Sequence, residues 1–411
     1  MTQVDVFQSE LNPFNPAIRD NPYPVYQALR EQAPIVEAAH GIWLLTRYDD
    51  CNTVLHDSRF GHLEPGEEPV NPMFGRLGDG IEPMCEPDGT PVIAFIATNP
   101  PGHTRVRGQL TQSFTVRNVT LLAPRITEIV DGILDRALAQ PEFDVLADVA
   151  YPLSVTVIGE VLGVPAADYG TFSAWTEQIC GGLDPALMQQ EGAAERMRTA
   201  RQEFADYFRA LAADRRAHPR ADVLTEMVSA TSADERLSDV EFVVTCTLLL
   251  IAGYETTANF LSNSVVSLLH HPEQLAYLRG LPEVPTEAAD ELLRFEAPGQ
   301  LASRVARADT EVAGVMIPKG HSVLALLGAA NRDPERFADP DRLDLRRPDV
   351  KHLSFGQGIH LCLGAQLARL EVRIALTRLL ARSPQLALAG PLTWKPHAAL
   401  RGLQQLRVRH G

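Results

Sequence analysis

Cysteine and positive charge are both scarce in this 411-residue sequence. The five cysteines are odd in number, lie far apart and include no Cys-x-x-Cys pair, which argues against a disulfide framework and against a zinc site. Lysine and arginine together number 37, against 52 aspartates and glutamates, and the net charge is −15. No polybasic run interrupts this acidic character, so binding to nucleic acid or to an anionic membrane is disfavoured.

Long hydrophobic runs are also missing. The longest, at residues 242–252, is too short to cross a bilayer and is flanked by Glu241 and Glu255. The N-terminal stretch carries acids and prolines where a signal peptide would carry a basic and then an apolar segment. We therefore expect a soluble, cytoplasmic protein with no membrane anchor.

No Gly/Ser-rich linker, internal repeat or clear boundary divides the chain, and we expect one domain over residues 1–411. Helical periodicity dominates residues 102–294. Strands are predicted in residues 35–50, in residues 303–327 and in a final hairpin after Pro391. The expected fold class is mainly α with minor β.

One long, buried helix is predicted in the middle of the chain. Ser238 and Glu241 form a capping-box pattern at its start, and Pro272 ends it. Its roughly 33 residues would extend about 50 Å, and its centre is apolar on nearly all sides. Glu255 and Thr256, in the segment AGYETT, are costly to bury there without partners. They fit either a polar cluster at a helix contact or a functional site.

Cys362 lies in the segment FGQGIHLCLG, at the start of a predicted helix whose apolar residues recur at helical spacing. A helix start favours a thiolate through its free N–H groups and its positive potential. Gly356 and Gly358 would let the backbone approach a flat group closely. The thiol fits three interpretations: an inert buried cysteine, a nucleophile or a soft metal ligand.

The choice between nucleophile and ligand depends on the neighbours of Cys362. A nucleophile needs a nearby base, and His360, two residues away, does not face the cysteine in regular structure. As a ligand, one thiolate is sufficient for haem, because the porphyrin supplies four other ligands. Dioxygen activation on haem also needs protons at a dry site, which an adjacent carboxylate and hydroxyl such as Glu255 and Thr256 could relay.

Several motifs together resemble those of the cytochrome P450 family. Every fixed position of its haem-binding signature FxxGxxxCxG is matched, by Phe355, Gly358, Cys362 and Gly364. AGYETT resembles its AGx(D/E)TT oxygen-activation motif, and ELLR its ExxR motif. The order of the motifs agrees, and NPYPVYQALREQAPIV and NPPGHTRVRGQLTQSFT are similar to the soluble bacterial branch. The resemblance spans essentially the whole chain and implies a single-domain P450 fold, with haem b between the long central helix and the helix after the cysteine loop.

The resemblance also implies a role for each matching residue. Cys362 would be the proximal iron ligand, with Phe355 packed beside it and the Gly364 N–H bonded to the sulfur. Thr256 would contact dioxygen, and Glu255 would supply protons. The other expected haem contacts are Ala252 and Gly253, which would leave room for dioxygen, and the propionate-binding residues His103, Arg107, Arg304 and His360.

A structural element and two departures accompany the resemblance. Glu291 and Arg294 of ELLR would form a buried ion pair with Arg342. Asn99 and Gly102 stand at positions that are usually acidic in this branch. The stretch 60–99 also looks longer than is common in the branch, and we expect it to shape the substrate pocket.

The expected pocket is mostly apolar, which implies a bulky lipophilic substrate oriented by few polar contacts. It would be formed by the 81–96 loop, the 170–190 region, the long helix and the C-terminal segment. Its candidate residues are Ile93, Phe95, Ile96, Leu248, Ile251, Gln300, Leu301, Ala399 and Leu400.

The expected reaction inserts one oxygen atom from dioxygen into a C–H or C=C bond, in secondary-metabolite pathways such as those of polyketides, macrolides or terpenoids. No flavin or iron–sulfur sequence is present, so electrons from NAD(P)H would arrive through a ferredoxin and its reductase, docking near Arg369 and Arg373. The alternatives are a peroxygenase and a non-catalytic haem-based sensor, which the intact pair of Glu255 and Thr256 disfavours. We expect a monomer.

Overall fold

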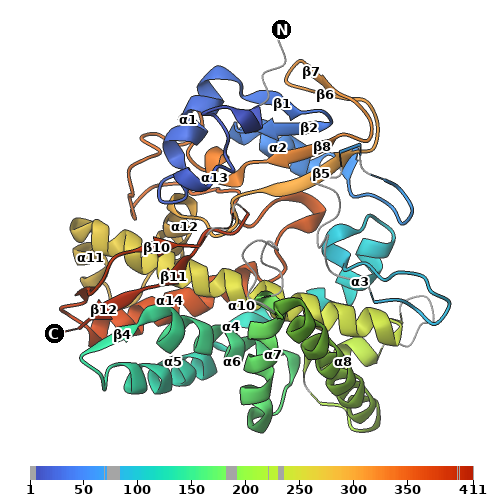
Figure 1. Ribbon diagram of the computed structural model, residues 1–411. Helices are drawn as coiled ribbons and strands as arrows, with labels where there is room; N and C mark the ends of the chain where they lie inside the picture. Colours follow the sequence, from blue (N-terminus) through green and yellow to red (C-terminus); the bar gives the residue numbers. More distant parts are fainter. Residues whose placement is uncertain are drawn as a thin grey trace.

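The computed structural model describes residues 6–68, 70–71, 84–181, 192–220, 222–229, 236–395, 397 and 399–410. Figure 1 shows two regions, a small one rich in strands and a larger one built of helices. The small region joins the N-terminal part of the chain to segments just beyond residue 300. The chain passes from the small region into the helical one, returns to the small region just beyond residue 300, and ends in the helical region.

A five-stranded sheet organises the small region. In sheet order its strands are β1 (Ile35–Ala39), β2 (Ile42–Leu45), β8 (Ser322–Ala325), β5 (Ala302–Ala306) and β3 (Phe60–Gly61). Strands β2 and β8 pair in parallel, and the other neighbours pair antiparallel. The helices of this region are α1 (Tyr23–Gln32), α2 (Tyr48–His56) and α13 (Leu327–Ala330).

The strands predicted in residues 35–50 are confirmed as far as Leu45. Residues 48–50 instead begin α2. Two aspartates, Asp49 and Asp50, occupy the first turn of this helix, where the partial positive charge of the helix N-terminus stabilises carboxylates. Aspartate is also unfavourable in strands, so the same residues argue against a longer β2.

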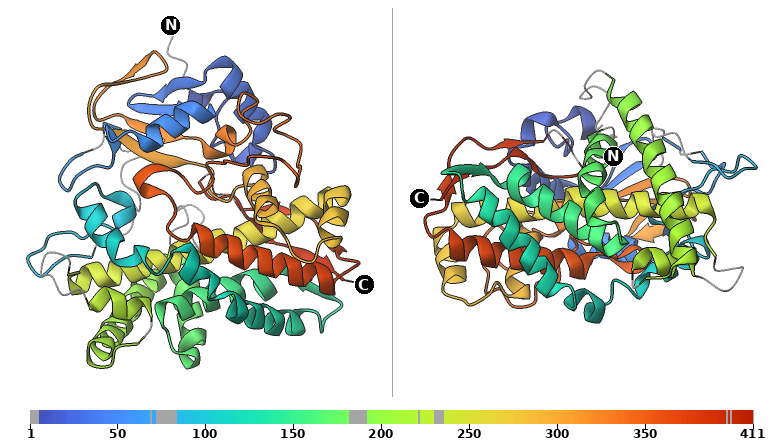
Figure 2. Two further views of the ribbon diagram at one scale, coloured as in Figure 1. Left: turned by 180° about the vertical axis from the view of Figure 1, so that it is seen from behind. Right: turned by 90° about the horizontal axis from the view of Figure 1, so that it is seen from below.

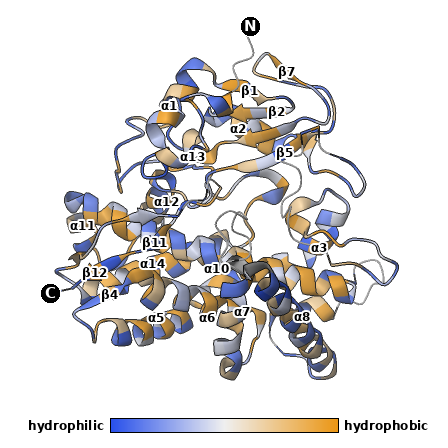
Figure 3. Cartoon of the chain, in the orientation of Figure 1, coloured by the Kyte–Doolittle hydropathy of each residue, from blue (hydrophilic) through white to orange (hydrophobic). Residues whose placement is uncertain are grey.

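The helical region contains most of the hydrophobic core. Its helices are α3 (Gly102–Thr111), α4 (Val116–Thr120), α5 (Ala123–Ala137), α6 (Tyr151–Leu162), α7 (Tyr169–Gly181), α8 (Ala193–Ala217), α9 (Val223–Val228), α10 (Asp239–His270), α11 (Pro272–Arg279), α12 (Thr286–Phe295) and α14 (Ala365–Arg382). Figure 3 shows hydrophobic residues along α5, α6 and α10, where these helices meet. A π-helical turn, Val145–Ala150, leads into α6.

Helix α10 is the predicted long helix. Ser238 accepts a hydrogen bond from the Glu241 N–H, and Glu241 accepts one from the Ser238 N–H, so the capping box is complete. The helix runs for 32 residues to His270 and ends before Pro272, as predicted, and Pro272 begins the next helix. It packs against α6, α12 and α14, and Figure 2 shows it crossing the helical region beside them. Helix α10 contains the AGYETT residues of the candidate site.

Short strands complete the fold. A three-stranded sheet has the order β4 (Glu142–Asp144), β12 (Arg407–Arg409) and β9 (Ala387–Leu388), and two hairpins join β6 (Thr310–Val312) to β7 (Val315–Ile317) and β10 (Thr393–Trp394) to β11 (Leu403–Gln405). The β-rich segment predicted at 303–327 and the hairpin predicted after Pro391 are both confirmed.

Two helical segments, Val145–Leu162 and Asp239–His270, are long and apolar enough to cross a membrane on length and composition alone. In the structure they pack against each other, and their apolar residues belong to the main hydrophobic core. Core helices of this kind meet the same length and composition criteria as a membrane span. The helix-rich fold with small sheets agrees with the predicted fold class.

Candidate functional site

The cysteine loop is held by its own backbone. The Cys362 N–H donates to the Phe355 carbonyl at 2.9 Å, which closes the loop between them. Helix α14 begins at Ala365, so Cys362 lies just before the helix rather than within it, although its carbonyl still accepts from the Ala365 N–H at 3.4 Å. Cys362 is exposed, whereas Cys51 and Cys246 are buried. The loop therefore presents this thiol for contact with a bound group.

The glycines of the loop serve the fold in a way that the sequence did not indicate. Gly358 has a φ of +69°, in the left-handed region that favours glycine. A Cβ atom at Gly358 would collide with the carbonyl oxygen of Leu55, at the end of α2. At Gly358 the structure therefore adds a second reason for glycine, close approach to α2, to the expected close approach to a flat group. Gly356, with a φ of +65°, likewise needs the left-handed conformation.

Opposing effects act on the Cys362 thiol. Desolvation by the surrounding protein raises its pKa, while the Gly364 N–H and the guanidinium groups of Arg107 and Arg369 lower it. Arg369 also lies over the ring of Phe355, with 4.5 Å between its Cζ atom and the ring centroid. It pairs with Asp290 at 2.6 Å. Arg369 on α14, held by Asp290 on α12, thus packs against the cysteine loop at Phe355.

The centre of α10 carries the AGYETT residues. Ala252 is exposed, although the helix around it is largely buried. The Thr256 hydroxyl donates to the Ala252 carbonyl one turn earlier, at 2.5 Å. A Cβ atom at Gly253 would lie 3.3 Å from the side chain of Ile158, so this glycine allows α10 to approach α6. Space for a small molecule is consequently better attributed to Ala252 than to Gly253.

Glu255 has a partner that the sequence did not indicate. Its carboxylate forms an ion pair with Lys395, which follows β10, and Asn259 donates to it at 3.3 Å. The Lys395 ammonium also donates to the Tyr151 hydroxyl at 2.6 Å. Because 140 residues separate Lys395 from Glu255, helix periodicity could not have linked them. The one available signal was that Lys395 is among only three lysines in the chain.

The four residues expected to bind propionates come from three elements. His103 and Arg107 lie on α3, Arg304 on β5, and His360 in the cysteine loop. The rings of His103 and His360 are 4.5 Å apart, and Arg107 donates to the Leu361 carbonyl at 2.6 Å. His62, which follows β3, joins the group with its ring 4.8 Å from that of His360. These five residues are called the basic cluster below.

The basic cluster has no acidic counterpart among the described residues. Within the described part of the chain, Arg107 and Arg304 donate to backbone carbonyls and pair with no carboxylate, and the two ring nitrogens of His360 are buried without a hydrogen bond. Burial lowers the pKa of Arg304 to about 10. Burial and repulsion from the neighbouring cations lower the pKa of His360 to about 2. Such a cluster is completed by anionic groups with several acceptor oxygens, as two carboxylates would provide.

Comparison with known proteins agrees with this geometry. The cytochrome P450 family model matches residues 185–280 and 286–382. Cytochrome P450 monooxygenase PikC of Streptomyces venezuelae is 39% identical, over 95% of this chain and 91% of that protein. Vitamin D(3) 25-hydroxylase of Pseudonocardia autotrophica is 37% identical, over 97% and 96%. The structure of the cytochrome P450 PksS, from the bacillaene polyketide synthase of Bacillus subtilis 168, has a TM-score of 0.84 at 34% identity, over 97% and 99%. The chain belongs to the cytochrome P450 family.

Membership makes the protein a cytochrome P450 monooxygenase and implies a haem-thiolate cofactor. Its bacterial relatives also imply redox partners that supply electrons. The residues present fit haem: an exposed cysteine is available to the iron, and the basic cluster is available to the two propionates. Helix α10, which carries Ala252 and Thr256, packs against α14, which follows Cys362.

The buried ion pair of this P450 is present, with a correction to its third member. Glu291 and Arg294 are paired at 2.7 Å, and both side chains are 0% exposed. The second arginine on Glu291 is Arg347, at 3.1 Å, and not Arg342. The Arg342 side chain is 65% exposed and reaches Asp344 at 3.5 Å. The segment DPDRLDLRR offers several arginines, and the sequence alone could not decide which of them turns inward.

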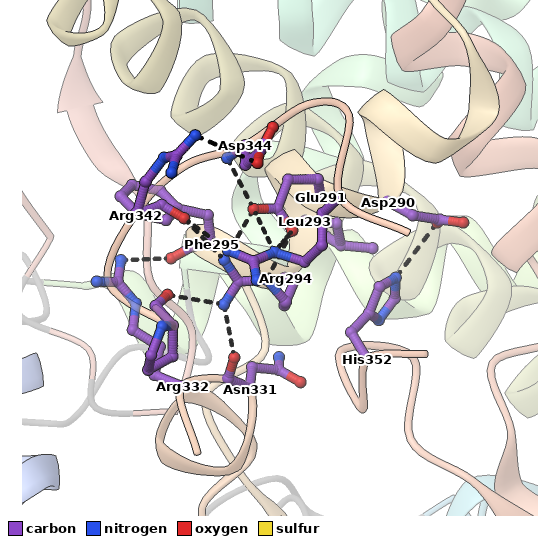
Figure 4. A network of polar contacts seen from close by, with 12 residues as sticks. Asp290, Glu291, Leu293, Arg294, Phe295, Asn331, Arg332, Arg342, Asp344 and His352 are labelled. Carbon is purple, nitrogen blue, oxygen red and sulfur yellow. Dashed lines mark hydrogen bonds and ion pairs between the residues drawn. The ribbon is translucent and has the colours of Figure 1, made fainter. Parts of the chain in front are cut away.

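Figure 4 shows how this network closes. The backbone of the loop, and not the Arg342 guanidinium, faces the pair: Arg294 donates to the carbonyls of Asn331 and Arg342, at 2.8 and 3.4 Å. The Asp344 N–H donates to Glu291 at 3.0 Å. Arg294 thus ties α12 to the loop that precedes the cysteine segment.

The expected substrate residues fall into different environments. Leu248 and Ile251 on α10, like Ile93, are partly buried, and Ile96 is exposed. Phe95 is buried in the main core, with its ring 6.3 Å from that of His103. Parts of the two loops expected to line the pocket, residues 81–83 and 182–190, lie outside the described residues.

Gln300 is a second correction. Its side chain is buried, accepts from the Tyr26 hydroxyl at 3.1 Å and donates to the Ala297 carbonyl at 2.6 Å. It therefore points toward Tyr26 of α1. Leu301 likewise packs on the N-terminal core cluster. The segment that contains Gln300 does lie next to the C-terminal segment, as expected. The Gln300 N–H donates to the Ala399 carbonyl at 2.9 Å, and Leu400 forms an antiparallel β-bridge with Gly299.

Proposed function

We propose that this P450 binds haem b through Cys362 and hydroxylates or epoxidises a bulky lipophilic molecule of secondary metabolism. The observation that carries the proposal is the combination of an exposed thiol with a basic cluster that has no acidic partner among the described residues. When bound, haem supplies the activation of dioxygen by a thiolate-ligated iron. The relative PksS, which by its name belongs to a polyketide synthase, supports a polyketide-like substrate.

In this proposal each group has a defined task. Cys362 holds the iron, and the basic cluster orients the propionates through charge-assisted hydrogen bonds. Ala252 leaves room beside α10, Thr256 holds a hydroxyl there, and Glu255 brings protons from solvent. Leu248, Ile251 and Ile93 supply part of an apolar wall for the substrate.

Turnover with purified components tests the proposal. The holoenzyme would be supplied with a surrogate ferredoxin, its reductase and NAD(P)H, and offered a panel of macrolides, terpenoids and fatty acids. We expect NAD(P)H consumption that depends on a lipophilic compound, with a product that gains one oxygen atom. Turnover driven only by hydrogen peroxide would support the peroxygenase alternative, and ligand binding without any turnover would support the sensor.

Thr256→Ala is expected to uncouple the reaction. Loss of the hydroxyl removes a proton donor and acceptor from the exposed side of α10, so the product formed per NAD(P)H should fall at least about tenfold while hydrogen peroxide release rises. The ratio is measured by product chromatography beside a peroxide assay. Thr256→Ser, which keeps the hydroxyl, is the matched control. Unchanged coupling in Thr256→Ala would contradict the relay.

Lys395 is expected to act as a positioning residue for Glu255. Lys395→Met removes the cation that pairs with the Glu255 carboxylate and keeps a side chain of similar length. We expect product per NAD(P)H to fall about three- to tenfold and its pH profile to change, because proton transfer depends on where the acid lies. Lys395→Arg should restore most of the coupling. If Lys395→Met and Lys395→Arg formed the same amount of product per NAD(P)H, the charge of Lys395 would not be what positions Glu255.

The electron partner is proposed to be a ferredoxin with its NAD(P)H-dependent reductase, and the protein to be a cytoplasmic, single-domain monomer. Both predicted docking residues make contacts within the chain. Arg369 pairs with Asp290, and Arg373 donates to the Val284 carbonyl at 2.8 Å and reaches Glu283 at 3.7 Å. Both arginines are partly buried and already paired, so they do not form a free basic patch.

A further inference from the structure

His62 is a member of the basic cluster for which the sequence predicted no role. It follows β3 directly, and its ring lies edge-on against His360 at an angle of 87°. The residue is 8% exposed, and its Nε2 atom is buried without a hydrogen-bond partner. A buried polar atom without a partner is costly, and it points to a group that is present when the protein is complete.

Asn99 fixes the backbone of His62. The Asn99 side-chain carbonyl accepts from the His62 N–H at 2.9 Å, and its amide donates to the His62 carbonyl at 2.9 Å. The same amide donates to Glu64 at 2.7 Å. A side chain at Gly61 would collide with the Asn99 amide, so the approach requires glycine there. An aspartate at position 99 could not donate either bond. Asn99, which departs from the acidic residue usual at this position, is thus the group that holds His62.

The nearest acids are engaged elsewhere. Glu64 and Glu67 pair with Arg307, at 3.5 and 3.2 Å, and Arg307 also donates to the His62 carbonyl at 2.7 Å. Burial, together with repulsion from the basic groups Arg304 and His103, lowers the pKa of the His62 ring to about 4. A neutral histidine has one N–H to donate, and the surroundings favour a negatively charged acceptor.

We propose that His62 donates a hydrogen bond from Nε2 to a haem propionate, as a fifth member of the cradle formed by His103, Arg107, Arg304 and His360, and that Asn99 positions it. The inference rests on the proposed haem function. It adds to that function a contact from the loop after β3, so that haem retention depends on the stretch beyond residue 60 as well as on the cysteine loop.

The experiment measures the rate at which the holoenzyme loses haem to excess apomyoglobin at neutral pH. Loss of one charge-assisted hydrogen bond should raise the rate about tenfold in His62→Ala. His62→Phe keeps the ring packing without the donor and should behave like the alanine variant. His62→Gln keeps a donor and should stay closer to wild type. Asn99→Asp should give an intermediate rate. His40→Ala, whose side chain is 78% exposed, is the control and should leave the rate unchanged.

A second readout separates this inference from the proposed function. Resonance Raman bands of propionate bending should shift in His62→Ala and His62→Phe, while the carbon monoxide spectrum of the reduced protein keeps its thiolate position. If His62→Phe lost haem at the wild-type rate and its propionate bands did not shift, the role of His62 would be overturned, because ring packing alone would then be sufficient to retain haem. Absence of a thiolate spectrum in the wild type would instead overturn the proposed function on which the inference rests.

Discussion

Cys362→Ala is expected to abolish the strongly red-shifted Soret band of the reduced, carbon monoxide-treated protein, together with all monooxygenase turnover. The loop between Phe355 and Gly364 leaves this one thiol exposed, and the Gly364 N–H stabilises its anionic form. Haem could still bind through its propionates and its apolar face, so the variant is predicted to retain some haem with a blue-shifted spectrum. Absorption spectroscopy of purified wild type and variant measures both effects.

The chain provides a matched control for this substitution. Cys85 is also exposed but lies in the loop before α3, far along the sequence from the cysteine loop. Cys85→Ala should therefore leave the red-shifted band unchanged. A red-shifted band that survives in Cys362→Ala would mean that another group binds the iron, and the assignment of the ligand would have to be abandoned.

Local patterns in the sequence were sufficient for much of the fold. The capping box at Ser238 and Glu241 and the proline at 272 bounded α10, because helix ends are determined by residues close in sequence. The cysteine motif similarly contains its own closing hydrogen bond, from Cys362 to Phe355. Features of this kind can be read from a single segment.

Contacts between distant segments could not be read in this way. Lys395 reaches Glu255 across 140 residues, and the choice of Arg347 over Arg342 depends on which way a loop turns. Gln300 was assigned to the substrate because its segment is close to residue 399, yet its side chain turns to Tyr26. For the arginine segment and for Gln300 the main-chain position was predicted, and the direction of the side chain was decided by tertiary packing, whereas the position of Lys395 was not predicted at all.

The same distinction explains why the basic cluster was only partly anticipated. Four of its members carry motif positions, and these could be carried over one by one from the family. His62 lies outside every motif. Its position beside His360 depends on the two hydrogen bonds between the Asn99 side chain and the His62 backbone, and on the absence of a side chain at Gly61. A site of this family can thus include residues that depend on the particular loop.

Glu291→Gln should give the largest loss of stability. Both partners of the Glu291–Arg294 pair are completely buried, and the substitution leaves two guanidinium groups, Arg294 and Arg347, without their carboxylate. Burial already lowers the pKa of Arg294, and Glu291 opposes that effect. Breaking a buried pair by removing one partner costs about 3 to 5 kcal/mol. The total free energy of unfolding of a folded protein is about 5 to 15 kcal/mol. We therefore expect the variant to fold poorly and to contain little haem. Urea unfolding of the holoenzyme, followed by circular dichroism and the Soret band, measures the loss.

Two comparisons make this prediction specific. Glu287→Gln changes an exposed carboxylate on the same helix and should alter the unfolding midpoint little. Arg347→Gln should destabilise strongly, whereas Arg342→Gln should not, because only the first side chain reaches Glu291. If Arg342→Gln proved as damaging as Arg347→Gln, the structural assignment of the second arginine would be wrong and the motif-based expectation right. If Glu291→Gln folded as well as wild type, the pair would be neutral, with its desolvation cost balancing its attraction.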